Sequence, residues 1–413
     1  MTEKNWAGNH TFTADRIHRP ASLDELRGVV SNAERIRPLG SRHSFTDIAD
    51  SAELIGFDHL ADRFEISADR STVTTAAHIT YGRLAATLEP HGLALHNLAS
   101  LPHITIAGAI ATGTHGSGDH NGNLATAVVG LELMTSAGET RTVNKGHPDF
   151  DGLVVSLGSA GIVTAVTLAV QPVFEVQQTV VEDVPWPAVE QSFDAVFSSG
   201  YSVSAFSRFG PTVAQLWLKT VADRPRTTEL FGGRAATEDR HPIIELPADS
   251  CTAQLGRPGL WSDRLPHFRM EFSPNVGDEI QSEFFVARSD TGAAIEALRS
   301  IGDRLKPALM VSEIRTIAGD ELWMSPHHRR DSVAFHFTWF ADPAAAQAAT
   351  ELVEAALAPF DPRPHWGKVF TPGSYSMPDL YPRLGDFLEL IDRYDHRRAF
   401  RNRWLDRVIG AGT

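Results

Sequence analysis

The chain has 413 residues, of which 42% are hydrophobic and 21% are charged, so two globular domains with sizeable cores fit its length and composition. The formal net charge is -14 with no basic patch, which disfavours nucleic acid and anionic lipid as partners and suits a neutral substrate. A single cysteine, Cys251, excludes a disulfide framework, and the polar residues 1–13 lack the apolar core of a secretory signal or membrane anchor, so we expect a soluble cytoplasmic protein.

The first part of the chain predicts an α+β domain of short strands and a few helices. Ser22-Leu23-Asp24-Glu25 is a capping box, and apolar residues at helical spacing after it predict an amphipathic helix over 23–34. The strands do not alternate regularly with helices, as they would in a doubly wound sheet. The other elements expected here are a strand at 36–39, hairpins at 64–66/72–77 and 128–134/140–143, a helix from Thr80 to about Gly92, and a strand at 161–170.

Beyond Pro172 the character of the chain changes. Residues 222–270 are rich in proline, arginine and glycine, and they predict long loops. Asp342-Pro343 opens a helix that runs to about residue 358, because aspartate is a good N-cap and proline suits the first helical position. With strands at 282–287, 311–316 and 333–340 and a helix at 291–305, this order predicts a second sheet with helices on one face.

Two glycine-rich loops point to a phosphate-bearing cofactor. His43 lies in a Gly/Ser turn after a short strand, and a second loop covers 111–118. The spacing Gly113-x-x-Gly116-x-Gly118 reverses that of the dinucleotide fingerprint, which disfavours a nicotinamide-type Rossmann site. Glycines still let backbone N–H groups approach a pyrophosphate closely. The alternatives are an ordinary tight turn for the second loop and a structural role for His43, whose imidazole is otherwise nucleophilic near neutral pH.

Alternation along two later strands places polar side chains on common faces. Glu313 and Arg315 point the same way, and so do His336 and Thr338. One such face would simply meet solvent, but two in succession, one with both a carboxylate and a guanidinium, favour a polar pocket. In His365-Trp366-Gly367-Lys368 we expect a lysine and a tryptophan on one strand-like face, with a surface lysine as the alternative. Trp323 and Trp339 are expected in the core. We expect no metal at His327-His328.

Seven segments, taken together, are specific for one family. They are Gly40 to Phe45, Asn97 to Ile104, Ala107 to Gly118, Ser156-Leu157-Gly158, Glu313 to Thr316, His336 to Trp339 and His365 to Phe370. In them the chain resembles the flavin-dependent alditol oxidases (xylitol oxidase type) of the vanillyl-alcohol-oxidase superfamily, which also holds the aldonolactone oxidases. The resemblance implies an α+β fold with an FAD-binding domain of the vanillyl-alcohol-oxidase (PCMH) type at 1–175, a substrate-binding cap domain with an antiparallel sheet and helices at 176–370, and a C-terminal segment at 371–413 that returns to the first domain.

The resemblance also implies FAD as the cofactor, joined covalently through its 8α-methyl group to His43. Two departures from the family pattern are Arg42, where many relatives carry glycine, and Ala399-Phe400-Arg401-Asn402, which more usually reads Lys-Phe-x-Asn after a Pro-Gly. The positions implied for catalysis are Lys368, Arg315, His336 and Glu313, and those for the substrate are Ser100, Glu313, Arg315, Thr338 and Lys368. The positions implied for FAD are Gly40, Ser41, Arg42, His43, Ser44, Ala99, Ser100, Pro102, Ala107, Gly108, Thr112, Gly113, Thr114, His115, Gly116, Ser117, Gly161, Ile162, Val163 and Lys368.

The expected reaction is oxidation of the terminal primary hydroxyl of an alditol, such as xylitol or sorbitol, to the aldose, with oxygen reduced to hydrogen peroxide. Inward-pointing polar groups suit a polyol, because each hydroxyl left unpaired on burial costs roughly 1–3 kcal/mol. Arg315 and Lys368 would stabilise negative charge, and His336 would accept or relay the proton. The alternatives are an aldonolactone oxidase or dehydrogenase of the same fold, or a non-enzymatic or metal-dependent sugar-binding protein that uses the 18 histidines. We expect a monomer.

Overall fold

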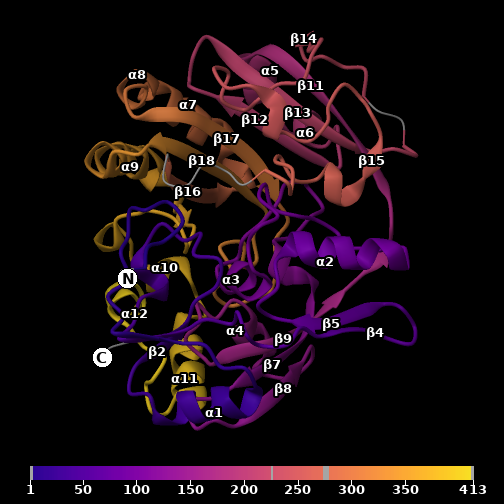
Figure 1. Cartoon of the computed structure of the whole chain (residues 1–413). Coiled ribbons are helices and arrows are strands. Elements are labelled where there is room, and N and C mark those ends of the chain that lie inside the picture. The colour runs from indigo at the N-terminus through magenta and orange to yellow at the C-terminus, as the bar shows by residue number, and fades with distance from the viewer. Residues whose placement is uncertain (1–2, 225–226, 273–278, 411–413) are drawn as a thin grey trace.

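The computed structural model describes residues 3–224, 227–272 and 279–410. A five-stranded sheet lies in the lower part of Figure 1 and a nine-stranded sheet lies in the upper part. One cluster of buried apolar side chains draws residues from both parts, so the two sheets share a continuous core. Within the described ranges, no helix is long and apolar enough to cross a bilayer.

Local signals set the elements around the five-stranded sheet. Ser22 accepts a hydrogen bond from the backbone N–H of Glu25 at the start of α1, and Thr80 accepts from that of Arg83 at the start of α2. The expected helix after Ser22 and both hairpins are confirmed. The sheet has the order β4-β5-β9-β7-β8, with β4 (Phe64–Ile66), β5 (Thr72–Ala76), β9 (Ile162–Ala169), β7 (Val128–Met134) and β8 (Thr140–Asn144), and its helices are α1 (Leu23–Asn32), α2 (Tyr81–Leu88), α3 (Ile106–Ala111) and α4 (Phe150–Val154).

A small parallel sheet lies directly before the first glycine-rich turn in the chain. Arg37 on its strand β2 is buried, and its guanidinium donates to the backbone carbonyls of Leu157, Gly158 and Phe400. This one side chain therefore ties β2 to the 156–158 turn and to the C-terminal segment. The sheet has the order β1-β3-β2, with β1 (Arg16–His18), β3 (Glu53–Ile55) and β2 (Ile36–Pro38), and a separate two-stranded sheet pairs β6 (Leu93–Ala94) with β10 (Gln171–Pro172).

The C-terminal helices, yellow in Figure 1, lie beside the N-terminal elements. Asn402 accepts from the N–H of Leu405 at the start of α12, and its amide group donates to the carbonyls of Ile48 and Asp50 at 3.0 and 2.9 Å. The tail that departs from the family pattern is thus held by Asn402, while the domain division expected from the sequence stays a prediction. The helices are α10 (Met377–Leu380), α11 (Leu384–Tyr394) and α12 (Arg403–Ile409).

The nine-stranded sheet contains the three predicted strands and several more. The order is β14-β11-β13-β12-β17-β18-β16-β19, with β15 paired to β11. The predicted strands are β16 (Glu279–Ala287), β17 (Leu309–Ile317) and β18 (Ser332–Phe340). The strands that were not predicted are β11 (Glu175–Pro185), β12 (Ser202–Ser207) and β13 (Thr212–Val221), as well as the short β14 (Arg234–Ala235), β15 (Gly259–Leu260) and β19 (Arg363–Pro364).

Helices cover one face of this sheet, as the sequence predicted. Asp342 caps α9 by accepting from the N–H groups of Ala344 and Ala345. The segment 222–270 is mostly loop, as expected, apart from 225–226, which lie outside the described residues. Trp323 and Trp339 are core residues. The helices are α5 (Trp186–Gln191), α6 (Phe193–Phe197), α7 (Thr291–Ser300), α8 (Gly302–Leu305) and α9 (Pro343–Leu357), of which α7 contacts both α5 and α9.

Candidate active site

A cavity of about 660 Å³ lies between the two sheets. The turn at 40–44, the loop at 107–115 and the segment at 156–163 contribute to one side, and strands β16, β17 and β18 contribute to the other. Every position expected for catalysis or substrate binding lines this cavity: Ser100, Glu313, Arg315, His336, Thr338 and Lys368. Most of the positions expected for FAD line it too, and those set behind its wall are Pro102, Gly113, Gly116, Ser117 and Ile162.

The two glycine-rich loops form one continuous wall of the cavity. The hydroxyl of Ser41 accepts a hydrogen bond of 3.2 Å from the backbone N–H of Thr105, which opens α3. A Cβ atom on Gly40 would lie 2.6 Å from the Thr105 Oγ1 atom, so glycine is required where the loops meet. Gly116 is likewise confined, since a Cβ there would lie 2.4 Å from the Leu98 carbonyl oxygen. The resulting wall of backbone suits a pyrophosphate.

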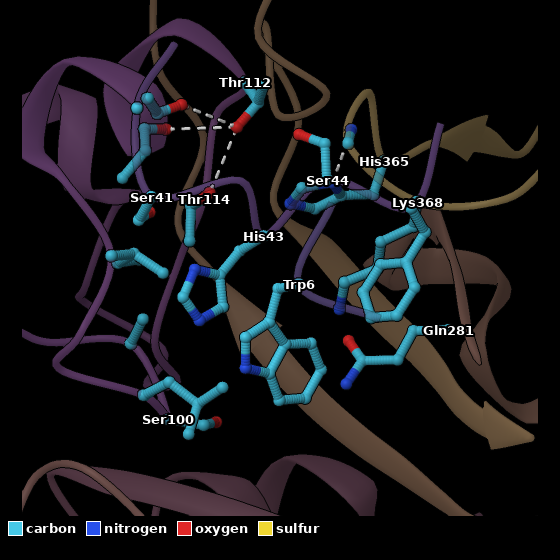
Figure 2. A pocket seen from close by; sticks show the side chains of 18 of the residues that line it. Trp6, Ser41, His43, Ser44, Ser100, Thr112, Thr114, Gln281, His365 and Lys368 are labelled. Carbon is cyan, nitrogen blue, oxygen red and sulfur yellow. Dashed lines mark hydrogen bonds between the residues drawn. The ribbon is translucent and has the colours of Figure 1, made fainter. Parts of the chain in front are cut away.

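His43 stands in this cavity with both ring nitrogens buried (Figure 2). Its imidazole stacks on Trp6, with ring centroids 5.2 Å apart and planes 15° apart. Among the residues that the structure describes, no side chain forms a hydrogen bond to either ring nitrogen. Burial lowers the pKa of His43 to about 4, although the Ser41 backbone opposes the shift. The imidazole is therefore neutral at pH 7 and keeps a lone pair that can act as a nucleophile.

The N-terminal segment holds the turn that carries His43. The backbone N–H of Trp6 donates to the Arg42 carbonyl at 2.8 Å, and the Asn5 amide group donates to the Ser44 carbonyl at 3.0 Å. Arg42 has a left-handed backbone, with φ 62°, and its exposed guanidinium pairs with Glu3. The charged end of Arg42 is therefore paired with Glu3, and Trp6, which no sequence pattern marked, is the neighbour of the His43 ring.

Three neighbouring strands place a row of polar side chains on the cavity. Glu313 on β17 lies opposite His336 on β18, and His336 lies opposite Glu283 on β16. Thr338 lies opposite Gln281 in the same way. The polar faces expected from alternation therefore meet in one pocket rather than solvent.

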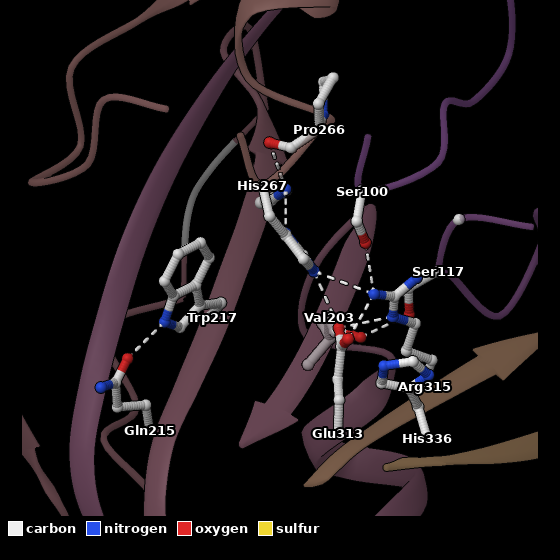
Figure 3. Close-up of polar contacts among 12 residues, drawn as sticks. Ser100, Ser117, Val203, Gln215, Trp217, Pro266, His267, Glu313, Arg315 and His336 are labelled. Carbon is white, nitrogen blue, oxygen red and sulfur yellow. Dashed lines mark hydrogen bonds and ion pairs between the residues drawn. The ribbon is translucent and has the colours of Figure 1, made fainter. Parts of the chain in front are cut away.

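On one side of this pocket, Arg315 contacts several of the polar side chains (Figure 3). Its guanidinium contacts both carboxylate oxygens of Glu313, with Nε 2.5 Å from Oε1, and Nη2 donates to the Ser100 hydroxyl at 2.5 Å. Nε2 of His267 lies 2.8 Å from the Glu313 Oε1 atom. Burial opposes ionisation of Glu313, but Arg315 and His267 outweigh it and hold the pKa of this carboxyl well below its usual range. Glu313 is therefore a carboxylate.

Lys368 is the hub of the other side. Its ammonium lies 2.8 Å from the Glu283 Oε2 atom and 2.7 Å from Nδ1 of His336. Because an ammonium only donates, Nδ1 accepts, so Nε2 carries the ring hydrogen and donates to the Thr338 hydroxyl at 3.2 Å. Burial and Lys368 lower the pKa of His336 to about 4. His336 is thus a neutral ring whose one lone pair is engaged by Lys368.

The strand-like face expected at 365–368 is wrong. The backbone N–H of Lys368 donates to the His365 carbonyl at 3.0 Å, which closes a turn. In this turn Lys368 enters the cavity, whereas Trp366 is fully buried and donates its Nε1 hydrogen to the Met324 carbonyl. The turn therefore separates two side chains that a strand would have placed on one face.

Sequence reasoning missed Glu283 and His267. Glu283 is 2% exposed, and Nε2 of His115 lies 3.2 Å from its Oε1 atom. Burial disfavours its charge, but Lys368 and His115 outweigh that and keep the pKa of Glu283 well below its usual range. The available signal was a lone carboxylate beside the apolar run Phe284-Phe285-Val286. No comparable signal marked His267, which comes from a loop.

Comparisons with known proteins agree with this geometry. Residues 14–144 match the family described as FAD binding domain, and residues 278–408 match the D-arabinono-1,4-lactone oxidase family. The alditol oxidase of Streptomyces sp. (strain IKD472 / FERM P-14339) is 43% identical over 406 residues, which cover 97% of each chain. The chain belongs to the alditol oxidase family. Membership of this family makes it an FAD-dependent oxidoreductase.

Two further similarities are to proteins with other names, one by sequence and one by structure. An L-gulono-1,4-lactone dehydrogenase of Mycobacterium tuberculosis is 26% identical, with 98% of each chain covered. The crystal structure of cholesterol oxidase from B. sterolicum superimposes with a TM-score of 0.78 at 16% identity, covering 99% of this chain and 96% of that one. The last likeness confirms the predicted fold class, an FAD-binding domain with a cap that carries an antiparallel sheet.

Proposed function

We propose that this protein oxidises the terminal primary hydroxyl of alditols such as xylitol and sorbitol to the aldose, with oxygen reduced to hydrogen peroxide. The observation that carries the proposal is one cavity that holds both the Ser100–Arg315–Glu313 cluster and the Lys368–His336–Thr338 cluster beside two glycine-rich loops. A polyol needs several donors and acceptors that point inward, because unpaired hydroxyls are costly to bury. Ser100, Thr338 and Glu313 supply them.

The residues around His43 fit FAD. The backbone wall at 107–115 suits the pyrophosphate, and within the described part of the chain the buried imidazole of His43 has no side-chain hydrogen-bond partner. We propose that an imidazole nitrogen of His43 bonds to the 8α-methyl carbon, with loss of one hydrogen from each and transfer of the two electrons finally to oxygen. When bound, the flavin accepts a hydride from the substrate carbon and returns the electrons to oxygen.

The pocket residues would then orient the substrate and move its proton. Arg315 and Lys368 place two positive charges where negative charge develops on the substrate oxygen. A shift of the Lys368 ammonium from His336 toward that oxygen would free Nδ1 of His336 to take the hydroxyl proton. Glu283 would keep Lys368 charged through this shift.

The test is a side-by-side peroxide assay with xylitol, sorbitol and gulonolactone. We expect peroxide from the two polyols and much less from the lactone. The lactone is included because residues 278–408 match the D-arabinono-1,4-lactone oxidase family. Peroxide from gulonolactone alone would replace the proposal with an aldonolactone oxidase, and a colourless protein without flavin absorbance would overturn both.

Glu283→Gln is expected to lower kcat for xylitol about 10- to 100-fold. The amide cannot balance the charge of Lys368, whose pKa burial already lowers, so less of it is protonated at neutral pH. Steady-state peroxide formation at pH 7.5 measures the effect. Glu296→Gln, on the exposed side of α7, is the matched control and leaves kcat unchanged. A Glu283→Gln variant with kcat within twofold of wild type would show that Glu283 does not support Lys368.

A further inference from the structure

Lys219 is a buried cation that the proposed reaction leaves without a role. It lies on β13 and is 1% exposed. Its Nζ atom lies 2.5 Å from the Leu265 carbonyl oxygen, 3.1 Å from the Pro266 carbonyl oxygen and 3.1 Å from Nδ1 of His267. Burying an ammonium group costs free energy, so its presence here, with three contacts, requires a physical explanation.

The contacts fix where the hydrogens of His267 lie. Glu313 is ionised and only accepts, so the His267 nitrogen 2.8 Å from it, Nε2, carries a hydrogen. If the ring is neutral, Nδ1 then has only a lone pair and accepts from Lys219. All three neighbours of the Lys219 Nζ atom are in that case acceptors, which matches the three donors of an ammonium.

We propose that Lys219 is a positioning residue that keeps His267 neutral, so that Glu313 remains the charged partner of Arg315 and of the substrate. The inference rests on the proposed function for the identity of that substrate. Lys219 and His267 lie close enough to compete for a single proton, and an alkyl amine is several units more basic than an imidazole. The proton therefore stays on Lys219 although burial lowers the pKa of both groups.

The other groups around His267 favour the same arrangement. Lys219 approaches it from β13, and Glu313 and Arg315 approach it from β17, while Phe206 and Trp217 make T-shaped ring contacts with it. The positive charge of Arg315, whose Nη2 atom lies 3.3 Å from Nε2, also disfavours a second proton on the ring. Burial and Lys219 together lower the pKa of His267 to about 3, against the opposing pull of Glu313.

Without Lys219, the imidazole of His267 would take a second proton at Nδ1. This new N–H would donate a hydrogen bond to the Leu265 carbonyl, which Lys219 no longer contacts. The resulting imidazolium would neutralise Glu313 across the 2.8 Å contact. Arg315 would then lose its counterion, and the substrate hydroxyls would lose a strong acceptor. This loss would set in only as the pH falls through the pKa of His267, which gives it a signature that general loosening of the fold lacks.

The test compares the pH dependence of kcat/KM for xylitol in FAD-loaded wild type and Lys219→Met between pH 8 and pH 5.5. Relative to wild type, the variant should lose activity toward the acid end of this range, because removal of the ammonium raises the pKa of His267 toward its ordinary value of about 6.5, although burial still lowers it. Lys219→Gln, whose amide can still donate to the two carbonyls, should show the same acid loss and covers the case in which methionine impairs folding. Lys306→Met, an exposed lysine paired with Asp303, is the control and follows wild type.

His267→Gln separates the proposed role from a structural one. Its amide nitrogen can donate to Glu313 but cannot titrate, so Lys219→Met in the His267→Gln background should have no acid loss. An acid loss that persists in this double variant belongs to another group and overturns the inference. So does a Lys219→Gln profile that follows wild type.

A second readout needs no turnover. In protein with 13C-labelled histidine, the Cε1–H resonance of His267, identified by its absence in His267→Gln, should not titrate between pH 5.5 and 8 in wild type. In the Lys219 variants it should begin to titrate toward the acid end of this range, because one of the causes that lower the pKa of His267 has been removed. If it stays fixed there, the inference is wrong whatever the substrate. If it titrates but wild type does not oxidise alditols, the proposed function fails and the role of Lys219 toward His267 stands.

Discussion

Arg315→Met is expected to lower kcat/KM for xylitol by about 10³-fold. The Arg315 guanidinium contacts both carboxylate oxygens of Glu313 and donates to the Ser100 hydroxyl. Its removal therefore takes away the hydrogen bonds that position Glu313 and Ser100 as well as its own charge. Breaking a buried ion pair by removing one partner costs about 3–5 kcal/mol, because the other charge is left uncompensated. Here Glu313 would keep only the hydrogen bond from His267. Steady-state peroxide assays give kcat/KM, and anaerobic stopped-flow spectroscopy gives the rate of flavin reduction.

Two further variants separate charge from geometry at this position. Arg315→Lys keeps the positive charge but not the fork that meets two carboxylate oxygens, so we expect it to lose about 10²-fold rather than recover wild-type activity. Arg299→Met is the matched control, since Arg299 forms an ion pair with Glu190 at the surface, away from the cavity. Activity of Arg315→Met within tenfold of wild type, in a protein that retains its flavin absorbance, would exclude Arg315 from substrate positioning.

The features that were predictable from the sequence depend on neighbours along the chain. Glu313 and Arg315 share a face because side chains alternate along any strand, and the same rule joins His336 to Thr338. The start of α9 at Asp342-Pro343 follows in the same way from an N-cap and a proline that suits the first turn. Such signals act over a few residues, so one sequence is enough to see them.

The features that were missed depend on which distant segments lie side by side. Glu283 joins the site only because β16 pairs with β18, which places it opposite His336. His267 and Trp6 reach the cavity from segments with no regular periodicity. The turn at 365–368 reads as a strand locally, but the hydrogen bond from the Lys368 N–H to the His365 carbonyl closes it. Register and loop paths of this kind are set by the whole core rather than by local propensity.

The two sides of the pocket repeat one physical arrangement. In each, a lysine donates to Nδ1 of a histidine, Lys219 to His267 and Lys368 to His336, which leaves the Nε2 hydrogen to point at an acceptor. The acceptor is the Glu313 carboxylate on one side and the Thr338 hydroxyl on the other. Both histidines are thereby held neutral. Lys368, unlike Lys219, is partly exposed to the cavity, so it alone can leave its histidine for the substrate.

His43→Ala is expected to remove all flavin fluorescence from the protein band after acid and detergent denaturation. We expect wild type to keep a fluorescent band, because a covalent bond survives unfolding whereas hydrogen bonds to a phosphate do not. The variant should still bind FAD before denaturation, since the backbone wall at 107–115 does not depend on the imidazole. His103→Ala is the matched control, because His103 also lies near His43 but donates its Nε2 hydrogen to the Met270 carbonyl at 2.8 Å.

The low pKa of His43 predicts a pH dependence of FAD attachment that differs from the one expected for a surface histidine. Because burial lowers this pKa to about 4, the imidazole stays neutral at pH 5.5, whereas an ordinary histidine with a pKa of about 6.5 would be mostly protonated. Attachment of FAD to wild-type apoprotein should therefore reach the same extent at pH 5.5 as at pH 7.5, measured as fluorescence of the denatured band. A dark wild-type band would rule out the bond while leaving the flavoenzyme intact, and a band that stays bright in His43→Ala would move the bond to another residue. Attachment that fails only at pH 5.5 would mean that the ring is more open to water than its stacking on Trp6 implies.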